Sequence, residues 1–120
     1  MVSHLPWSPH RGGEYVPAMT DLPADALHVV ATLPTDPASA EEVRAALVKL
    51  GAATLGEEGC YAYDVYESQS TPGVFVTVEA WRGQADLDAH MKTPHIAEAF
   101  TVLGDALTDK VAVHPLTPVR

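Results

Sequence analysis

Apolar residues along the chain alternate in some stretches and recur at helical spacing in others. Residues 26–33 form a β-branched run between prolines, which is typical of a strand. Apolar positions at helical spacing follow over residues 40–55. Ser39 and Glu42 precede them in the pattern of a capping box, which satisfies free backbone donors at a helix start. We therefore expect a strand and then a helix.

Two more strands are predicted at residues 60–67 and 74–81, joined by a polar loop that contains a Pro-Gly pair. Strict alternation places Tyr61 and Tyr63 on one face of the first strand. In the second strand, alternation separates one face with Phe75, Thr77, Glu79 and Trp81 from a drier face with Val74, Val76, Val78 and Ala80.

Residues 81–107 predict two helices that meet at a corner. The first helix is short, and its inward side is apolar except for His90. Pro94 ends it, because proline lacks a backbone donor and disfavours helical geometry in the preceding residue. Thr93 can then cap a second helix with Pro94 at its first position. Both His90 and His95 should stand near the corner.

A last strand is predicted at residues 110–116. The order of strand, helix, two strands, paired helices and strand predicts the α+β class, with a ferredoxin-like βαββαβ fold and a four-stranded antiparallel sheet. Right-handed connections place the helices on one face of this sheet. The other face then carries the uncovered apolar row at residues 74–80, so we expect a second copy of the chain to cover it in a symmetric homodimer.

The 120-residue chain divides into residues 1–23, an N-terminal extension, and residues 24–120, one folded domain. The extension holds four prolines, two adjacent glycines and no periodicity, so a flexible tail is the simpler interpretation. Trp7 could instead dock on a partner or on the domain. His4 and His10 suggest a metal-binding tail only weakly, because a proline-rich coil fixes no ligand geometry.

Composition narrows the class of partner. The formal net charge is −9 with only seven Lys and Arg residues, which argues against nucleic acid or an anionic membrane surface. No apolar run reaches the length of a membrane span, and the N-terminus lacks the apolar core of a signal peptide. The single cysteine, Cys60, suits a reducing compartment. We expect a cytoplasmic protein.

Three segments in this order and spacing, EEGCYAYDVYES, PGVFVTVEAW and DLDAHMKTPHIAEAF, resemble the antibiotic biosynthesis monooxygenase family. Within that family they are most similar to small bacterial quinol monooxygenases. The resemblance spans residues 27–115, and its most specific part is Trp81 followed by the segment 90–95. It implies a dimeric α+β barrel and, in the best-studied branch, oxygenation of phenols or quinols by O₂ without metal, flavin or haem.

This chemistry fits the residues present. A deprotonated quinol can itself pass an electron to O₂, so the protein need supply only a dry pocket and a base. The sequence contains no Rossmann, Walker or Cys-x-x-Cys motif, and we expect no cofactor and no metal. An imidazole is suited to accept a phenolic proton near neutral pH. The catalytic candidates are His90 and Trp81, and the substrate-binding candidates are Tyr61, Tyr63, Glu79, His95 and Phe100.

Each candidate also has a structural interpretation. His90 could be a core histidine whose ring nitrogens are hydrogen-bonded within the protein. Trp81 could simply fill the core, and His95 could serve only the geometry at the start of its helix. A metal site at His90 and His95 is unfavoured, because ligands on one helix face need a spacing of three or four. The haem-degrading branch of the family has an iron-binding histidine where this chain has Phe100, so haem ligation is not expected.

Two other functions remain open. Signal-processing enzymes of the same superfamily share a similar Thr-Pro-His corner, at residues 93–95 here, so the chain could be an isomerase or lyase on a small metabolite. It could also be a non-catalytic dimeric module that binds a small molecule.

Overall fold

A computed structural model describes residues 22–120 of the chain, so the extension predicted at residues 1–23 lies almost wholly outside the described residues. The described elements, in order, are β1 (Leu27–Pro34), the 3-10 helix η3 (Pro37–Ser39), α1 (Ala40–Thr54), β2 (Cys60–Glu67), β3 (Val74–Trp81), α2 (Gln84–His90), α3 (Pro94–Ala106) and β4 (Ala112–Pro115).

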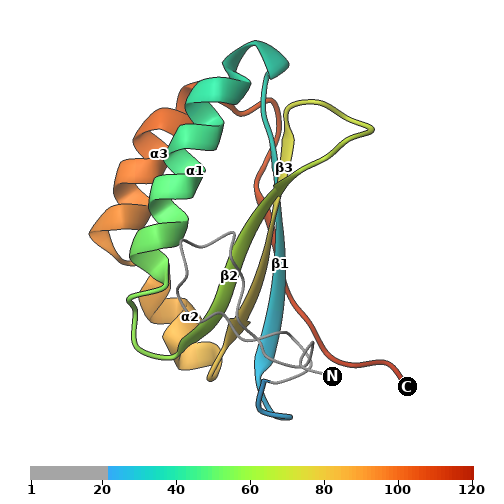
Figure 1. Ribbon diagram of the computed structural model, residues 1–120, viewed down its shortest axis with the longest axis vertical. Coiled ribbons are helices and arrows are strands. Elements are labelled where there is room, and N and C mark those ends of the chain that lie inside the picture. Colours follow the sequence, from blue (N-terminus) through green and yellow to red (C-terminus); the bar gives the residue numbers. More distant parts are fainter. Residues whose placement is uncertain (1–21) are drawn as a thin grey trace, which may run out of the picture.

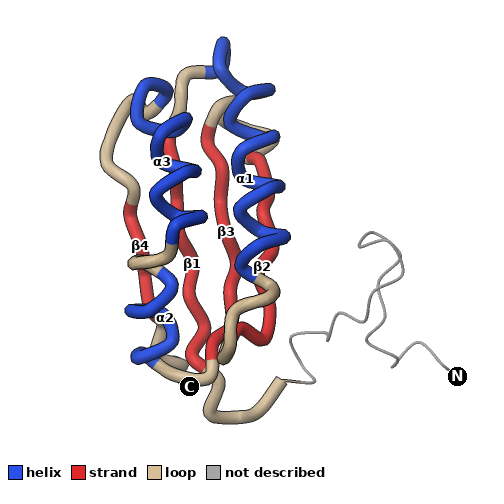
Figure 2. The backbone as a smooth tube through the Cα atoms, turned by 90° about the vertical axis from the view of Figure 1, so that its left-hand side faces the viewer, coloured by secondary structure: helices blue, strands red, loops and turns tan. Residues whose placement is uncertain are grey.

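The four strands form one antiparallel sheet in the order β2-β3-β1-β4. This is the predicted ferredoxin-like α+β fold, and the prediction is confirmed. All the labelled helices lie on one face of the sheet (Figure 1). Figure 2 shows α1 over β2 and β3, and α2 and α3 over β1 and β4. The space between helices and sheet therefore holds the core.

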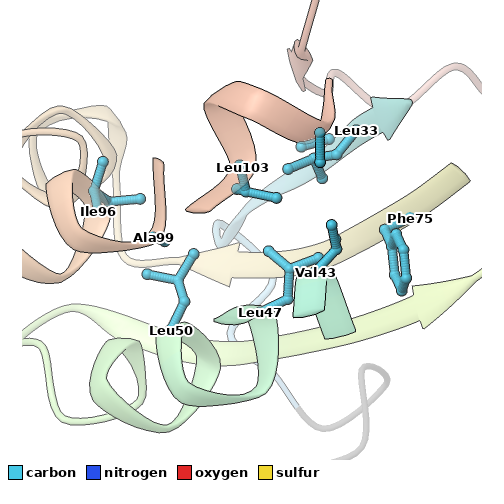
Figure 3. Close-up of a cluster of buried hydrophobic side chains, with 10 residues drawn as sticks. Leu33, Val43, Leu47, Leu50, Phe75, Ile96, Ala99 and Leu103 are labelled. Atoms are coloured by element: carbon cyan, nitrogen blue, oxygen red, sulfur yellow. The ribbon is translucent and has the colours of Figure 1, made fainter. Parts of the chain in front are cut away.

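Ten buried hydrophobic residues pack together in this space, toward the end where α1 begins and α3 ends, which is the upper end in Figure 1. We call them the apolar cluster. On α1 its members are spaced by four and three residues, and on α3 by three and four, so each helix turns one stripe toward the other (Figure 3). Full burial of such a side chain is worth about 1.5–3 kcal/mol. The members are Ala31, Leu33, Val43, Leu47, Leu50, Phe75, Ile96, Ala99, Leu103 and Ala106.

The two long helices begin differently. Thr93 caps α3 as predicted, because its Oγ1 accepts a hydrogen bond from the backbone N–H of Ile96 at 3.3 Å. The capping box predicted for α1 is wrong, since the Ser39 side chain makes no capping hydrogen bond. Ser39 ends the 3-10 helix and lacks the extended backbone of a capping residue. Asp36 instead accepts a hydrogen bond from the N–H of Ala38 at 3.0 Å.

A bulge interrupts the alternation of β2 at Tyr61. Cys60 lies opposite Trp81, and Ala62 opposite Ala80, so β2 carries one more residue than β3 over this stretch. Strict alternation through Tyr61 is therefore wrong, and Cys60 packs with Tyr63 and Trp81 on the helix-facing side. The last strand is also shorter than predicted, since β4 spans only four residues.

The opposite face of the sheet carries the apolar row of β3. Val74, Val76 and Val78 are half-buried, and Ala80 is buried. No helix within residues 22–120 lies over this face (Figure 1). Over the same residues, no helix has the length and apolar character needed to cross a membrane.

Candidate functional site

A cavity lies between the sheet and the corner that joins α2 to α3. The empty volume of the cavity is about 430 Å³ when its open mouth is included. The centre of a water-sized molecule can occupy only about 30 Å³ of this volume, so the cavity is narrow. Most of the lining is aliphatic or aromatic, and Met91 and Val113 are exposed at its edge. The polar or ionisable lining side chains are Tyr63, Thr77, Glu79 and His90. The site is thus a narrow, mostly apolar cavity with a few convergent polar groups.

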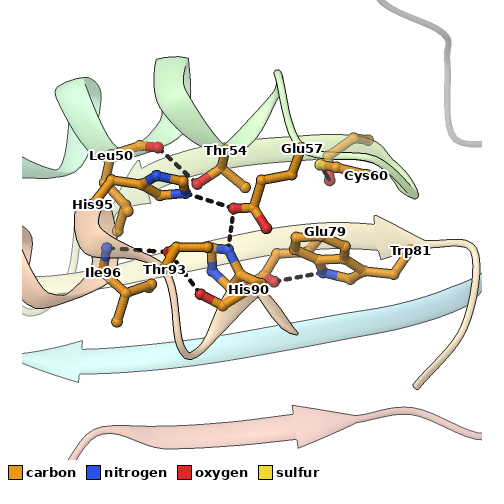
Figure 4. Close-up of polar contacts among 11 residues, drawn as sticks. Leu50, Thr54, Glu57, Cys60, Glu79, Trp81, His90, Thr93, His95 and Ile96 are labelled. Carbon is orange, nitrogen blue, oxygen red and sulfur yellow. Dashed lines mark hydrogen bonds and ion pairs between the residues drawn. The ribbon is translucent and has the colours of Figure 1, made fainter. Parts of the chain in front are cut away.

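Beside the cavity, one carboxylate holds both histidines of the corner (Figure 4). Oε2 of Glu57 lies 2.6 Å from Nδ1 of His90 and 2.6 Å from Nε2 of His95. We call these three residues the Glu57 triad. Glu57 lies on the loop between α1 and β2, more than thirty residues from either histidine in sequence.

The contact with Glu57 favours one tautomer of a neutral His90. An ionised carboxylate only accepts hydrogen bonds, so both histidine nitrogens that contact Glu57 donate to it. A neutral His90 protonated at Nδ1 then has a lone pair at Nε2. Within residues 22–120, every side-chain nitrogen or oxygen that is fully shielded from solvent has a hydrogen-bond partner. No described residue makes a hydrogen bond to Nε2 of His90, so this atom is not fully shielded. His90 is 2% exposed and lines the cavity, so Nε2 is open to it.

A second carboxylate, Glu79, is buried at the cavity wall. Thr77 Oγ1 donates to Glu79 Oε2 at 2.6 Å, and Trp81 Nε1 donates to Glu79 Oε1 at 2.8 Å. Both carboxylate oxygens are therefore satisfied without a cation, as a buried charge requires. Glu79 is thus paired with two donors, and it also lines the cavity.

Tyr63 stands next to His90, with ring centroids 5.6 Å apart. Burial raises the pKa of the Tyr63 phenol far above its ordinary value, and the nearby Glu79 carboxylate raises it further. The phenol of Tyr63 therefore stays protonated at physiological pH. It lines the cavity as a neutral, amphipathic ring.

The loop that carries Glu57 is attached to the start of α2. Gly59 has φ +84°, and a Cβ at this position would overlap the Asp86 carboxylate. The backbone N–H of Arg82 donates to Gly59 O at 2.7 Å, and the Arg82 guanidinium pairs with Glu58 at 3.3 Å and with Asp86 at 2.8 Å. A close backbone approach and an ion-pair network thus set the position of Glu57.

Four of the predicted site residues line the cavity: Tyr63, Glu79, His90 and Phe100. They come from β2, β3, α2 and α3, so the fold brings together side chains that are well separated in sequence.

Three predicted residues lie outside the lining. Trp81 is fully buried behind Glu79 and packs against His90 with ring centroids 4.8 Å apart. His95 contacts the site through Glu57. Tyr61 is the extra residue of the β2 bulge and does not line the cavity. Sequence reasoning missed Glu57, and its only local signal was an acidic residue between Gly56 and Gly59 in the matched EEGC segment.

A ferredoxin-like α+β domain with an apolar cavity beneath its helices describes a broad class of small-molecule-binding proteins. Comparison with known proteins is more specific. The family model described as "Antibiotic biosynthesis monooxygenase" matches residues 26–102, and the chain belongs to this family. Family membership supports a monooxygenase-like function.

Two curated relatives are similar over most of their length. "Putative monooxygenase Rv0793" of Mycobacterium tuberculosis is 35% identical over 91 residues, which cover 76% of this chain and 89% of the relative. "Probable quinol monooxygenase YgiN" of Escherichia coli is 31% identical over 98 residues, which cover 72% of this chain and 94% of the relative. Both names indicate enzymes.

Solved structures share the fold. The structure of Rv0793 from Mycobacterium tuberculosis superposes with a TM-score of 0.71 at 33% identity, over 80% of this chain and 97% of the other. A structure from Caulobacter crescentus, described as a putative antibiotic biosynthesis monooxygenase, superposes with a TM-score of 0.72 at 27% identity. The superposition covers 79% of this chain and 91% of the other.

Proposed function

We propose that the protein is a cofactor-independent monooxygenase that oxidises a quinol or polycyclic phenol with O₂ in the cavity beneath the α2–α3 corner. The observation that carries this proposal is His90, whose Nδ1 is held by Glu57 at 2.6 Å while its other nitrogen is open to an apolar cavity. A base fixed in this way can accept a proton from a bound hydroxyl group.

His90 Nε2 removes the phenolic proton, and the Glu57 carboxylate stabilises the imidazolium that forms. The phenolate passes one electron to O₂, and the resulting radical pair combines at a ring carbon that bears hydrogen. The peroxide then takes up a proton and loses water, which leaves a carbonyl at that carbon. One oxygen atom of O₂ ends in the product and the other in water, so the substrate supplies all the electrons.

The remaining lining suits a flat, electron-rich ring. Phe100 and Tyr63 offer aromatic faces, and the protonated Tyr63 does not compete with His90 as a base. Because the cavity is narrow, such a substrate enters by displacing side chains at the mouth. Met91 is suited to this movement, since it is 44% exposed and has a flexible thioether side chain.

The active form is a cytoplasmic homodimer under this proposal. The half-buried row of Val74, Val76 and Val78 lies on the sheet face that no helix within residues 22–120 covers. This row supports pairing, because a contiguous apolar sheet face is costly in water. Sedimentation equilibrium at micromolar concentration tests it, and a monomer there would contradict it.

Oxygen uptake tests the enzyme proposal. Protein treated with a chelator is mixed with a reduced naphthoquinone or a tricyclic phenol in an oxygen electrode, and we expect uptake without added cofactor. His90→Ala should lower kcat by roughly 10²–10⁴-fold, the usual contribution of a general base. His28→Ala is the matched control, since His28 lies on β1 outside the cavity lining. Normal uptake in His90→Ala would exclude His90 as the base.

Trp81→Phe tests a positioning role. This substitution keeps a ring beside His90 but removes the donor to Glu79 Oε1. We expect a smaller loss of kcat than in His90→Ala, with an unchanged KM, because Trp81 does not line the cavity. A change in KM alone would indicate that Trp81 contacts the substrate.

An isomerase or lyase acting by proton transfer is the second candidate, and the Glu57 triad supports it because it needs no oxygen. The cavity lining among the described residues includes no Lys or Arg, which disfavours a phosphorylated substrate. Turnover of a small carbonyl compound that persists under anaerobic conditions would favour this candidate. Tight binding of an aromatic ligand without turnover would indicate a binding module instead.

A further inference from the structure

The Glu57 triad has the composition of a metal site. Its three ligand atoms, one carboxylate oxygen and two imidazole nitrogens, all lie within 4.8 Å of one another. The spacing rule that disfavours His90 and His95 applies to ligands on one helix face. Here His90 ends α2 and His95 begins α3, and the turn between them directs both rings to the same carboxylate (Figure 4).

The corner that holds the two histidines is fixed by hydrogen bonds. Thr93 donates to the carbonyl of His90 twice, from its backbone N–H at 3.2 Å and from Oγ1 at 2.8 Å. The ring of His90 also packs against Trp81 and Tyr63. Two ligands of the triad are thereby pre-positioned, which lowers the ordering cost of binding an ion.

We propose that Glu57, His90 and His95 bind one divalent transition-metal ion of the Zn²⁺ type through Oε2, Nδ1 and Nε2. Zinc takes nitrogen and carboxylate ligands at about 2.0–2.2 Å, which places ligand atoms on a tetrahedral ion roughly 3.3 Å apart. The 2.6 Å contacts must therefore open by less than about 1 Å. Rotation about the side-chain bonds of Glu57 can supply this movement without any shift of its backbone.

The surroundings favour a cation and give it access. The side chains of Glu57 and His95 are 14% and 23% exposed, so an ion and a water ligand can reach the triad from solvent. The net charge of −9 adds a negative field around the whole protein. A site with three protein ligands and an open fourth position is a familiar zinc arrangement.

The ion would also control the base, and this second part rests on the proposed function. A metal on Nδ1 leaves the single proton of a neutral imidazole on Nε2, the nitrogen that faces the cavity. His90 then presents a donor where the reaction needs an acceptor. Zn²⁺ is thus an inhibitor that competes with the Nδ1 proton donated to Glu57.

Binding is measured first, without substrate. The full chain is stripped with a chelator and titrated with Zn²⁺ by calorimetry, and with Co²⁺ by its visible absorption bands. We expect one equivalent to bind. Loss of a residue that only hydrogen-bonds to a metal ligand weakens metal binding by roughly 10–100-fold. Glu57→Gln and His95→Gln each change a ligand itself, so each should weaken Zn²⁺ binding by more than this. Absence of stoichiometric binding, or unchanged affinity in both variants, would overturn the proposal.

Controls separate the triad from other histidines. His114→Gln on β4 and the double substitution His4→Gln, His10→Gln in the N-terminal extension should retain full affinity. Loss of binding in the extension variant alone would place the ion there and contradict the site. Circular dichroism of each triad variant confirms that it folds, so that lost binding reports on the ligands.

The two proposals fail separately. If Zn²⁺ binds at the triad but no phenol or quinol supports O₂ uptake, the metal site stands and the oxygenase does not. If uptake occurs, one equivalent of Zn²⁺ should suppress it in the wild type, and chelator should restore it. Uptake that is unaffected while the triad is saturated would overturn the inhibitory role.

Discussion

The two ends of the space between helices and sheet are built in different ways. The apolar cluster contains ten buried hydrophobic residues, and those that face the cavity form its apolar wall. The lower end combines a small cluster of Val29, Tyr63, Trp81 and Leu87 with the buried polar residues Glu79 and His90. Each of these two polar residues has a hydrogen-bond partner, and such a bond contributes only about 0.5–1.5 kcal/mol net. The upper end therefore supplies stability, and the lower end supplies chemistry.

The two ends also differ in local structure. Regular spacing along α1, α3 and the strands β1 and β3 builds the apolar cluster. The lower end depends on irregular features: the bulge at Tyr61, the left-handed Gly59 and the corner at Thr93. Irregular backbone at the lower end positions side chains that a straight helix or strand could not bring together.

The largest effect on stability is expected in the apolar cluster. Leu47→Ala removes a fully buried side chain and leaves a cavity, so the free energy of unfolding should fall by about 2–5 kcal/mol. Denaturant titration measures this loss. Val48→Ala, one residue along and 62% exposed, should change stability by less than about 0.5 kcal/mol. Equal losses would mean that the cluster does not dominate stability.

A smaller effect is expected at the loop of the lower end. Gly59→Ala forces a side chain into left-handed backbone against Asp86, which should cost about 1–3 kcal/mol and displace Glu57. Gly56→Ala is the matched control, because a Cβ there meets only Ala53 O at an ordinary 3.5 Å. Thermal unfolding compares the two. If Gly56→Ala costs as much, the backbone at Gly59 is not the constraint.

The corner should respond to loss of its cap. Thr93→Ala removes the acceptor for the Ile96 N–H and should lower stability by about 1 kcal/mol. Thr101→Ala removes only a bond to Ala97 O within the exposed face of α3 and should cost less. Amide exchange at Ile96 checks the local effect, and unchanged protection there would contradict the capping role.

The smallest effect concerns the exposed rim of the upper end. The hydrogen bond from Arg44 lowers the pKa of Glu67 below its ordinary value of about 4.5. Because the folded pKa is the lower one, this stabilisation is present above the unfolded pKa and is lost as pH falls through the folded pKa. Arg44→Ala should flatten the fall in Tm below about pH 4.5. An identical slope in both proteins would exclude the pair.

Much of this arrangement could be predicted. The bounds of β2 and β3, the Thr93 cap and the ferredoxin-like order were confirmed, because each depends on neighbours in sequence or on strong periodicity. The identity of His90 as an inward-facing histidine follows from the same spacing. Trp81 was named as a catalytic candidate with a core residue as the alternative, and it lies behind the cavity wall, where it donates to Glu79. No periodicity encodes that contact.

The sequence by itself determined the elements, their order and which faces of the helices are apolar, since a side chain's direction follows from helical or strand repeat. Only the tertiary structure decided the site. Glu57 meets His90 and His95 across more than thirty residues, through a glycine loop and a proline corner. Such a contact depends on how the elements pack and on the backbone turns between them. Neither produces a repeating pattern of residues from which the contact could be predicted.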